Sequence, residues 1–339
     1  MERKSKIPFF NSSIEEDVKL PVPKEEKLVV FPDRKETKVD YEAHLKSVIE
    51  QQRLRKEADA SQEVAHVEIK TNLDYALVVG SGDWHIGSEN TDYKLFDSHM
   101  KAIKDTEGVY AVMVGDEKDN FVLPKFRSGL FEGVLNPQQQ ADMVKGILGG
   151  LEEKDKILAR VSGNHDEWTW TESGVELSNF WHNEMKSPLL RNGGFVHLKL
   201  NEVDYTLYLH HGKSLFNSNF NPNHASKRAF EFQGPYDAMF SGHTHVAEAA
   251  HSWRWADEFK KDYVQVRTGT YKTKDPYARA KQLGEGQPPG ACILMSTEDK
   301  RMMPFLKLED GIEALKAINT VNSLIAQGLL GEPEIEGKK

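Results

Sequence analysis

The sequence has few of the features that mark secreted, membrane-spanning or strongly basic proteins. It contains a single cysteine, Cys292, in the apolar run ACILMS, so no internal disulfide can form and a buried thiol is predicted. No run approaches the roughly 18 apolar residues of a membrane span, and the beginning MERKSKIPFFNSS has no apolar stretch typical of a signal peptide. The formal charge of −9 gives no general attraction to nucleic acid or anionic lipid, although a local basic strip could still bind a nucleic acid. We therefore expect a cytoplasmic protein that makes no membrane contact.

The 339 residues suffice for one large domain with extensions, or for two domains. Residues 1–70 form an N-terminal extension that is rich in proline and charge and contains a short amphipathic helix pattern with Asp40 as its N-cap. Residues 71–310 carry the pattern of a globular domain, and residues 311–339 read as a C-terminal helix and a solvated tail. We expect the extension or this helix to contact a second subunit or a protein partner.

Apolar runs after the extension alternate with helical patterns. Strands are predicted at residues 75–80, 109–115 and 156–163, with helices at 95–106 and from Pro137 onward. Such alternation indicates parallel pairing in a layered α/β fold. After residue 190 the strands follow one another more directly, which predicts a second, mostly antiparallel or mixed sheet.

Five of the apolar runs stop at a turn that contains glycine and carries aspartate, asparagine or histidine. These residues are Asp83, His85, Asp116, Asp119, Asn164, His165, Asp166, His210, His211, His243 and His245. Side chains at the carboxyl ends of strands converge on the crevice where α/β sheets bind ligands. We therefore expect one site to be assembled from five separate segments.

The chemistry of this set suits metal ions. It contains carboxylate, amide and imidazole groups and no thiolate, which favours borderline and hard divalent ions. Two such ions roughly 3.5–4 Å apart can share a carboxylate, lower the pKa of bound water to near 7 and hold the oxygens of a displacement at phosphorus. We therefore predict two divalent metal ions as cofactor, with manganese favoured and iron, zinc or nickel as alternatives.

The motifs and their order resemble those of the calcineurin-like metallophosphoesterase superfamily, over about residues 73 to 275. They read Asp83-Trp84-His85, Gly115-Asp116-Glu117-Lys118-Asp119, Gly163-Asn164-His165-Asp166, His211-Gly212 and Gly242-His243-Thr244-His245. The block DWHIG is most similar to that of double-strand-break repair exonuclease subunits. The resemblance implies a four-layer α-β-β-α sandwich of two mixed sheets with flanking helices, and a metal site at the carboxyl ends of the strands.

The resemblance also assigns metal ligands. One ion would be held by Asp83, His85 and His245. The other would be held by Asn164, His211 and His243. Asp116 would bridge the two ions, and Asp119 would fix one of the ligands.

Catalytic and substrate-binding roles follow from the same resemblance. His165 would face the phosphate and give a proton to the leaving oxygen, and Asp166 would orient His165 and keep it protonated. In the loop after the last strand near the site, Lys272, Lys274 and Arg279 would contact substrate phosphates.

The expected activity is metal-dependent hydrolysis of a phosphoester, with DNA or RNA as the first choice of substrate. A small-molecule or nucleotide phosphodiester is one alternative, and a phosphoprotein or another monoester is a second. A catalytically inactive scaffold of the same fold is a further class, against which the complete set of motif residues argues.

Overall fold

The computed structural model describes residues 40–58, 63–122, 131, 133–175, 184–212, 223–256, 259–273, 279 and 284–331. Contacts divide the chain into two compact units, Met1–Glu57 and Ala58–Lys339. Within the described residues no helix has both the length and the apolar character that crossing a membrane would require.

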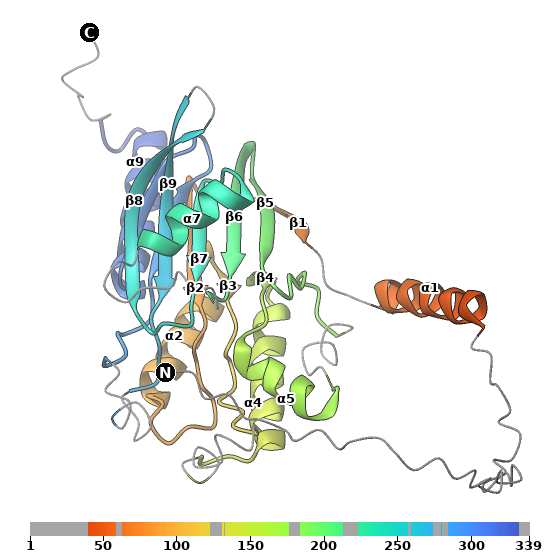
Figure 1. The fold of residues 1–339 in the computed structure, drawn as a ribbon. Coiled ribbons are helices and arrows are strands. Elements are labelled where there is room, and N and C mark those ends of the chain that lie inside the picture. Colours follow the sequence, from red (N-terminus) through yellow and green to blue (C-terminus); the bar gives the residue numbers. More distant parts are fainter. Residues whose placement is uncertain are drawn as a thin grey trace, which may run out of the picture. The chain divides into compact units, whose positions relative to one another are not determined.

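Helix α1 (Tyr41–Ala58) forms nearly all of the described part of the first unit, which ends at Glu57 (Figure 1). Asp40 caps it as predicted, because its Oδ1 accepts a hydrogen bond from the backbone N–H of Ala43 at 3.1 Å. The apolar side chains Tyr41, Leu45 and Ile49 are all exposed. The expected contact of this helix with a partner therefore remains a prediction.

The second unit contains a five-stranded sheet in which the central strand and the two strands on one side of it are parallel. Its strands, in spatial order, are β11 (Met302–Phe305), β10 (Cys292–Ser296), β2 (Tyr75–Ser81), β3 (Val109–Met113) and β4 (Ile157–Arg160). Strands β2, β3 and β4 pair in parallel, as the alternation of strands and helices predicted. Strands β10 and β11 extend the sheet with antiparallel pairings.

The other sheet has six strands and is also mixed. In spatial order they are β1 (Val64–Ile69), β5 (Gly194–Leu200), β6 (Val203–His210), β7 (Ala238–Ser241), β9 (Phe259–Thr268) and β8 (Ala247–Ala256). The predicted hairpin is formed by β5 and β6, which turn at Asn201 and Glu202. Strands β6, β7 and β9 are parallel, and β8 returns antiparallel to β9.

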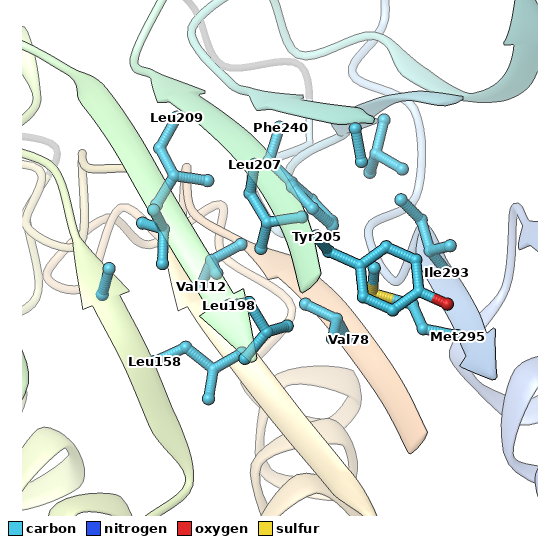
Figure 2. Packing of buried hydrophobic residues seen from close by; sticks show 14 of the residues in the cluster. Val78, Val112, Leu158, Leu198, Tyr205, Leu207, Leu209, Phe240, Ile293 and Met295 are labelled. Atoms are coloured by element: carbon cyan, nitrogen blue, oxygen red, sulfur yellow. The ribbon is translucent and has the colours of Figure 1, made fainter. Parts of the chain in front are cut away.

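The main hydrophobic core lies between the two sheets. Figure 2 shows Val78 and Val112 of the five-stranded sheet beside Leu207 and Phe240 of the six-stranded sheet, all almost completely buried. The outer face of the five-stranded sheet is covered by α2 (Tyr93–Asp105), α4 (Pro137–Glu152) and α9 (Leu308–Ala326). Helix α7 (Asn223–Gln233) packs on the outer face of the six-stranded sheet (Figure 1). The predicted four-layer α-β-β-α sandwich of two mixed sheets is therefore confirmed.

Two boundaries differ from those expected from the sequence. Strand β1 begins at Val64 and pairs in parallel with β5, so part of the expected extension (residues 1–70) belongs to the sandwich. The C-terminal helix α9 is not a separate appendage, because Leu308 and Leu315 are buried and Gly311 lies against Cys292 and Leu77. The predicted burial of the Cys292 thiol is confirmed.

Candidate metal centre

The candidate site lies where strands of both sheets end. Turns after β2 and β3 carry Asp83 and Asp116, and turns after β6 and β7 carry His211 and His243. The backbone N–H of His243 donates to Asp83 Oδ2 at 2.8 Å, and His211 Nδ1 lies 2.7 Å from the carbonyl oxygen of Val114. These two hydrogen bonds join the sheets at the site.

The turns hold several of these residues in an unusual backbone conformation. Five of the seven predicted ligands have positive φ: Asp83 (48°), His85 (50°), Asp116 (56°), His243 (71°) and His245 (58°). Residues other than glycine rarely adopt this region, and such conformations concentrate at functional sites where the surrounding structure enforces them. The N–H groups of Asp83 and His85 are fixed by hydrogen bonds to the carbonyl oxygens of Gly115 and Asp116.

Asp83, His85 and His245 form one cluster of possible metal ligands, with one atom of each within 4.8 Å of the others. The Nε2 atoms of His85 and His245 are 3.0 Å apart, and His245 Nε2 lies 3.7 Å from Asp83 Oδ1. On its other side, His85 Nδ1 lies 3.1 Å from Asp119 Oδ1, which places the ring proton at Nδ1 and leaves the Nε2 lone pair for a ligand. This set can therefore hold a divalent ion.

Asp116, His211 and His243 form a second cluster within the same distance limit. His211 donates its Nδ1 proton to Val114, so that Nε2 faces the cluster, 2.9 Å from Asn164 Oδ1 and 3.0 Å from Asp116 Oδ2. The structure thus brings together the three side chains expected to hold the second ion, with Asp116 beside them.

Asp116 links the two clusters. It is 2% exposed and also forms a third close group with His85 and His165. Its Oδ1 accepts the backbone N–H of His165 at 2.9 Å, while Oδ2 faces His211. A carboxylate between two sets of imidazole nitrogens has the position that a bridging ligand needs.

Burial and mutual attraction shift the pKa values of the carboxylates and imidazoles at the site. Burial raises the pKa of Asp83 to about 6, against the attraction of the His211 ring. Burial also opposes ionisation of Asp116, but the rings of His211 and His165 outweigh it and hold the pKa of Asp116 well below its usual range. The same attraction, from Asp116 and Asp83, overcomes burial and raises the pKa of His211 to about 9. Without metal ions, Asp116 and His211 therefore form a buried ion pair.

His165 lies at the site, but Asp166 does not orient it as expected. His165 Nδ1 lies 2.5 Å from the carbonyl oxygen of Asp119. Asp166 instead accepts hydrogen bonds from Lys118 Nζ and from the N–H of Gly163. Burial lowers the pKa of His165 to about 4, so the ring is neutral at neutral pH. The expectation that Asp166 holds His165 protonated is therefore wrong, because the carboxylate is already engaged by a buried lysine.

The three predicted substrate-binding residues have different positions. Lys272 is 7% exposed, and its Nζ donates to Asp119 Oδ1 at 2.8 Å. Arg279 is exposed, and Lys274 lies outside the described residues. Contact with a phosphate stays a prediction for Arg279 and Lys274. Lys272 instead pairs with Asp119, whose Oδ1 also faces the predicted ligand His85.

Several further residues support the site, and of these Lys118 and Thr268 were not singled out from the sequence. Lys118 is 1% exposed and pairs with Asp166, and the ring of Trp168 lies against His165 with centroids 3.8 Å apart. Thr268 Oγ1 donates to Asp83 Oδ2 at 3.3 Å. Neither residue has a local signal in the sequence, because Lys118 occupies an unspecified position of the G-D-x-x-D block and the contact of Thr268 crosses between the two sheets.

No protein-family model and no curated protein matches the sequence. Similar solved structures include a single mutant of Vps29 from Entamoeba histolytica (11% identity, TM-score 0.35) and wild-type Vps29 from the same organism complexed with zinc (11%, 0.33). A predicted phosphoesterase from Streptococcus pneumoniae is also similar (14%, 0.31). Each alignment covers 68% of this chain and 97% of the other. Because the identities and TM-scores are this low, no activity of these proteins can be assigned to this chain. The function of the candidate site must be inferred from its own residues.

Proposed function

We propose that the protein is a metal-dependent phosphoester hydrolase that cleaves phosphodiesters, with nucleic acid as the first choice of substrate. The observation that carries the proposal is the pair of ligand clusters, one of which contains Asp116, together with the close group of His85, Asp116 and His165 that connects them. The motifs of the calcineurin-like metallophosphoesterases, which this chain resembles, fall on the turns that build these clusters.

The donor groups fit two divalent ions. Asp83, His85 and His245 would hold one of them. Asn164, His211 and His243 would hold the other, with Asp116 shared. When bound, such ions activate water and neutralise the charge that develops on phosphoryl oxygens. Manganese is the first choice among the ions that suit imidazole and carboxylate ligands.

His165 supplies the proton chemistry of the proposal. Its Nδ1 proton is held by the carbonyl oxygen of Asp119, and its Nε2 faces the clusters, 3.8 Å from Asp116 Oδ2. A phosphoryl anion beside Nε2 raises the pKa of the ring by attraction, so substrate binding favours a second proton there. His165 can then pass that proton to the leaving oxygen.

The test is a parallel assay of the chelator-treated protein with added Mn²⁺. The substrates are bis-p-nitrophenyl phosphate, p-nitrophenyl phosphate, and single- and double-stranded DNA. Hydrolysis of the diester and of DNA supports the proposal, while hydrolysis of the monoester alone contradicts the choice of phosphodiesters. Metal binding without hydrolysis of any substrate would favour an inactive scaffold.

Three variants make this assay specific for the site. We expect Asp83→Ala to lose metal affinity and activity together. His165→Ala should keep its metal ions and lose about 10²–10⁴-fold in rate, which is the usual contribution of general acid–base catalysis. The exposed residue His251 offers the control, and His251→Ala should behave as wild type.

A further inference from the structure

Lys272 occupies a buried position that the loop after β9 fixes firmly. Its backbone forms an isolated antiparallel bridge with Thr91, and its N–H donates to Thr270 Oγ1 at 3.0 Å. Thr270 Oγ1 in turn donates to the carbonyl oxygen of Asp83 at 2.8 Å. The backbone of Lys272 is therefore tied to the segment that carries a predicted metal ligand.

The side chain of Lys272 reaches the same oxygen that faces His85. Asp119 Oδ1 lies 2.8 Å from Lys272 Nζ and 3.1 Å from His85 Nδ1. The Lys272 ammonium group also lies 5.0 Å from the centre of the Phe121 ring. Asp119 itself is anchored independently, because its backbone N–H donates to the carbonyl oxygen of Ile86 at 3.0 Å. The lysine therefore places a positive charge beside the Asp119 carboxylate, and the position of Asp119 does not depend on it.

We propose that Lys272 controls metal affinity through Asp119 and His85, as a fixed counter-charge, and does not bind substrate phosphate. The inference rests on the proposed function in that a divalent ion binds at His85. A carboxylate that accepts the Nδ1 proton of a ligating histidine makes the ring a better ligand. An ammonium group that pairs with this carboxylate weakens its effect on the histidine, and its positive charge also repels the metal ion.

The same cation has the opposite effect on the metal-free protein. Asp119 has a side chain only 6% exposed, and a buried carboxylate is costly unless a partner compensates its charge. Lys272 provides that compensation while no ion is bound. The lysine therefore stabilises the metal-free site and lowers its affinity for divalent ions, and these two effects have opposite signs that experiment can separate.

The test is a double-mutant cycle of Lys272→Met and Asp119→Asn, with Mn²⁺ affinity measured by titration calorimetry. We expect K272M to bind Mn²⁺ several-fold more tightly and its metal-free form to melt at a lower temperature. D119N should bind Mn²⁺ more weakly, by roughly the 10–100-fold typical of residues that support metal ligands. In the D119N background, K272M should have a smaller effect, because the path through the carboxylate is gone.

Other variants provide controls. Lys272→Arg keeps the charge and should restore wild-type affinity, and Lys272→Gln replaces K272M if the methionine variant does not fold. Lys300 is a matched control outside the site, since its Nζ lies 3.3 Å from Asp237, another buried carboxylate. Lys300→Met should leave Mn²⁺ affinity unchanged.

The outcomes separate this inference from the proposed function. Unchanged or weaker Mn²⁺ binding by K272M, with a raised KM for the diester, would make Lys272 a substrate contact and overturn the inference alone. An equal effect of K272M in both backgrounds would show that it does not act through Asp119. Wild-type protein that binds no divalent ion would overturn the proposed function, and this inference with it.

Discussion

The backbone of Gly163 lies directly against the carboxylate of Asp116, so closely that a β-carbon at position 163 would overlap Oδ1. The φ of Gly163 is −89°, which any residue can adopt. Glycine is therefore required here for close approach and not for backbone conformation. The central carboxylate of the candidate site owes its position to a residue with no side chain.

This contact predicts that Gly163→Ala disrupts the metal centre without changing a ligand. The added methyl group must displace Asp116. Mn²⁺ affinity should therefore fall on the order of 100-fold or more, because losing a residue that only supports a ligand already costs about 10–100-fold. Overpacking should also lower the free energy of unfolding by about 1–3 kcal/mol. Calorimetric titration and urea unfolding measure the two effects.

Gly149 in α4 is the matched control, because a β-carbon there meets no atom within 4 Å. Gly149→Ala should leave metal affinity unchanged and stabilise the helix by about 0.5–1 kcal/mol. Equal metal affinity in G163A and wild type would contradict the described position of Asp116.

Lys118 and Asp166 form a buried ion pair whose partners are 1% and 7% exposed. Removing one partner leaves a buried charge uncompensated, so Lys118→Met should lower the free energy of unfolding by about 3–5 kcal/mol. The double variant Lys118→Met/Asp166→Leu should recover much of this loss. Chemical denaturation of the three proteins checks the prediction, and equal losses in the single and double variants would count against the pairing.

The raised pKa of His211 predicts how the stability of the metal-free protein depends on pH. The pKa rises from 6.5 to about 9 on folding because Asp116 and Asp83 attract the charged ring. The stabilisation is therefore complete below about pH 6.5 and is lost as the pH rises through about 9. Melting temperatures of wild type and His211→Gln should converge over this range, whereas a constant difference would contradict the ion pair.

Metal binding should release protons, because the raised pKa keeps His211 protonated in the metal-free protein at neutral pH. His211 must give up its Nε2 proton to act as a ligand, so Mn²⁺ affinity should increase with pH up to about 9. Titration in buffers of different ionisation enthalpy measures the released protons. His211→Gln should release fewer protons than wild type at pH 7.

The ring of Trp168 holds His165 in place through a contact of 3.8 Å between centroids. Trp168→Ala should therefore lower kcat by about 10-fold or more while Mn²⁺ affinity stays unchanged, because only His165, the proposed proton donor, loses its support. Trp170, on the same helix, is 56% exposed and gives the control. An equal loss of kcat in W168A and W170A would exclude a specific role for the contact between Trp168 and His165.

Much of the site followed from the sequence because its residues come directly after buried strands. Asp83 and Asp116 follow β2 and β3, whose apolar runs and parallel pairing place their ends together. Asp166 shows the limit of such reasoning. Its neighbour in sequence is His165, but its partner in space is Lys118, and only the fold of the intervening segments decides between them.

The same limit explains the differences in domain boundaries. Strand β1 pairs with β5, far along the chain, so the local pattern of residues 64–69 did not show its place in the sheet. Strand β8 has the sequence AEAAHSWRWA, in which β-branched residues are absent, and its pairing with β9 supplies the strand conformation. For β1 the partner strand lies far along the chain, whereas β8 pairs with the strand that directly follows it.

The central claim is that two groups of ligands share Asp116 and hold two divalent ions. Anomalous diffraction from crystals grown with Mn²⁺ tests it most directly. The account predicts one peak among Asp83, His85 and His245, and a second among Asn164, His211 and His243, with Asp116 in contact with both. Crystals of correctly folded protein with no peak between these side chains, or with peaks only elsewhere, would contradict it.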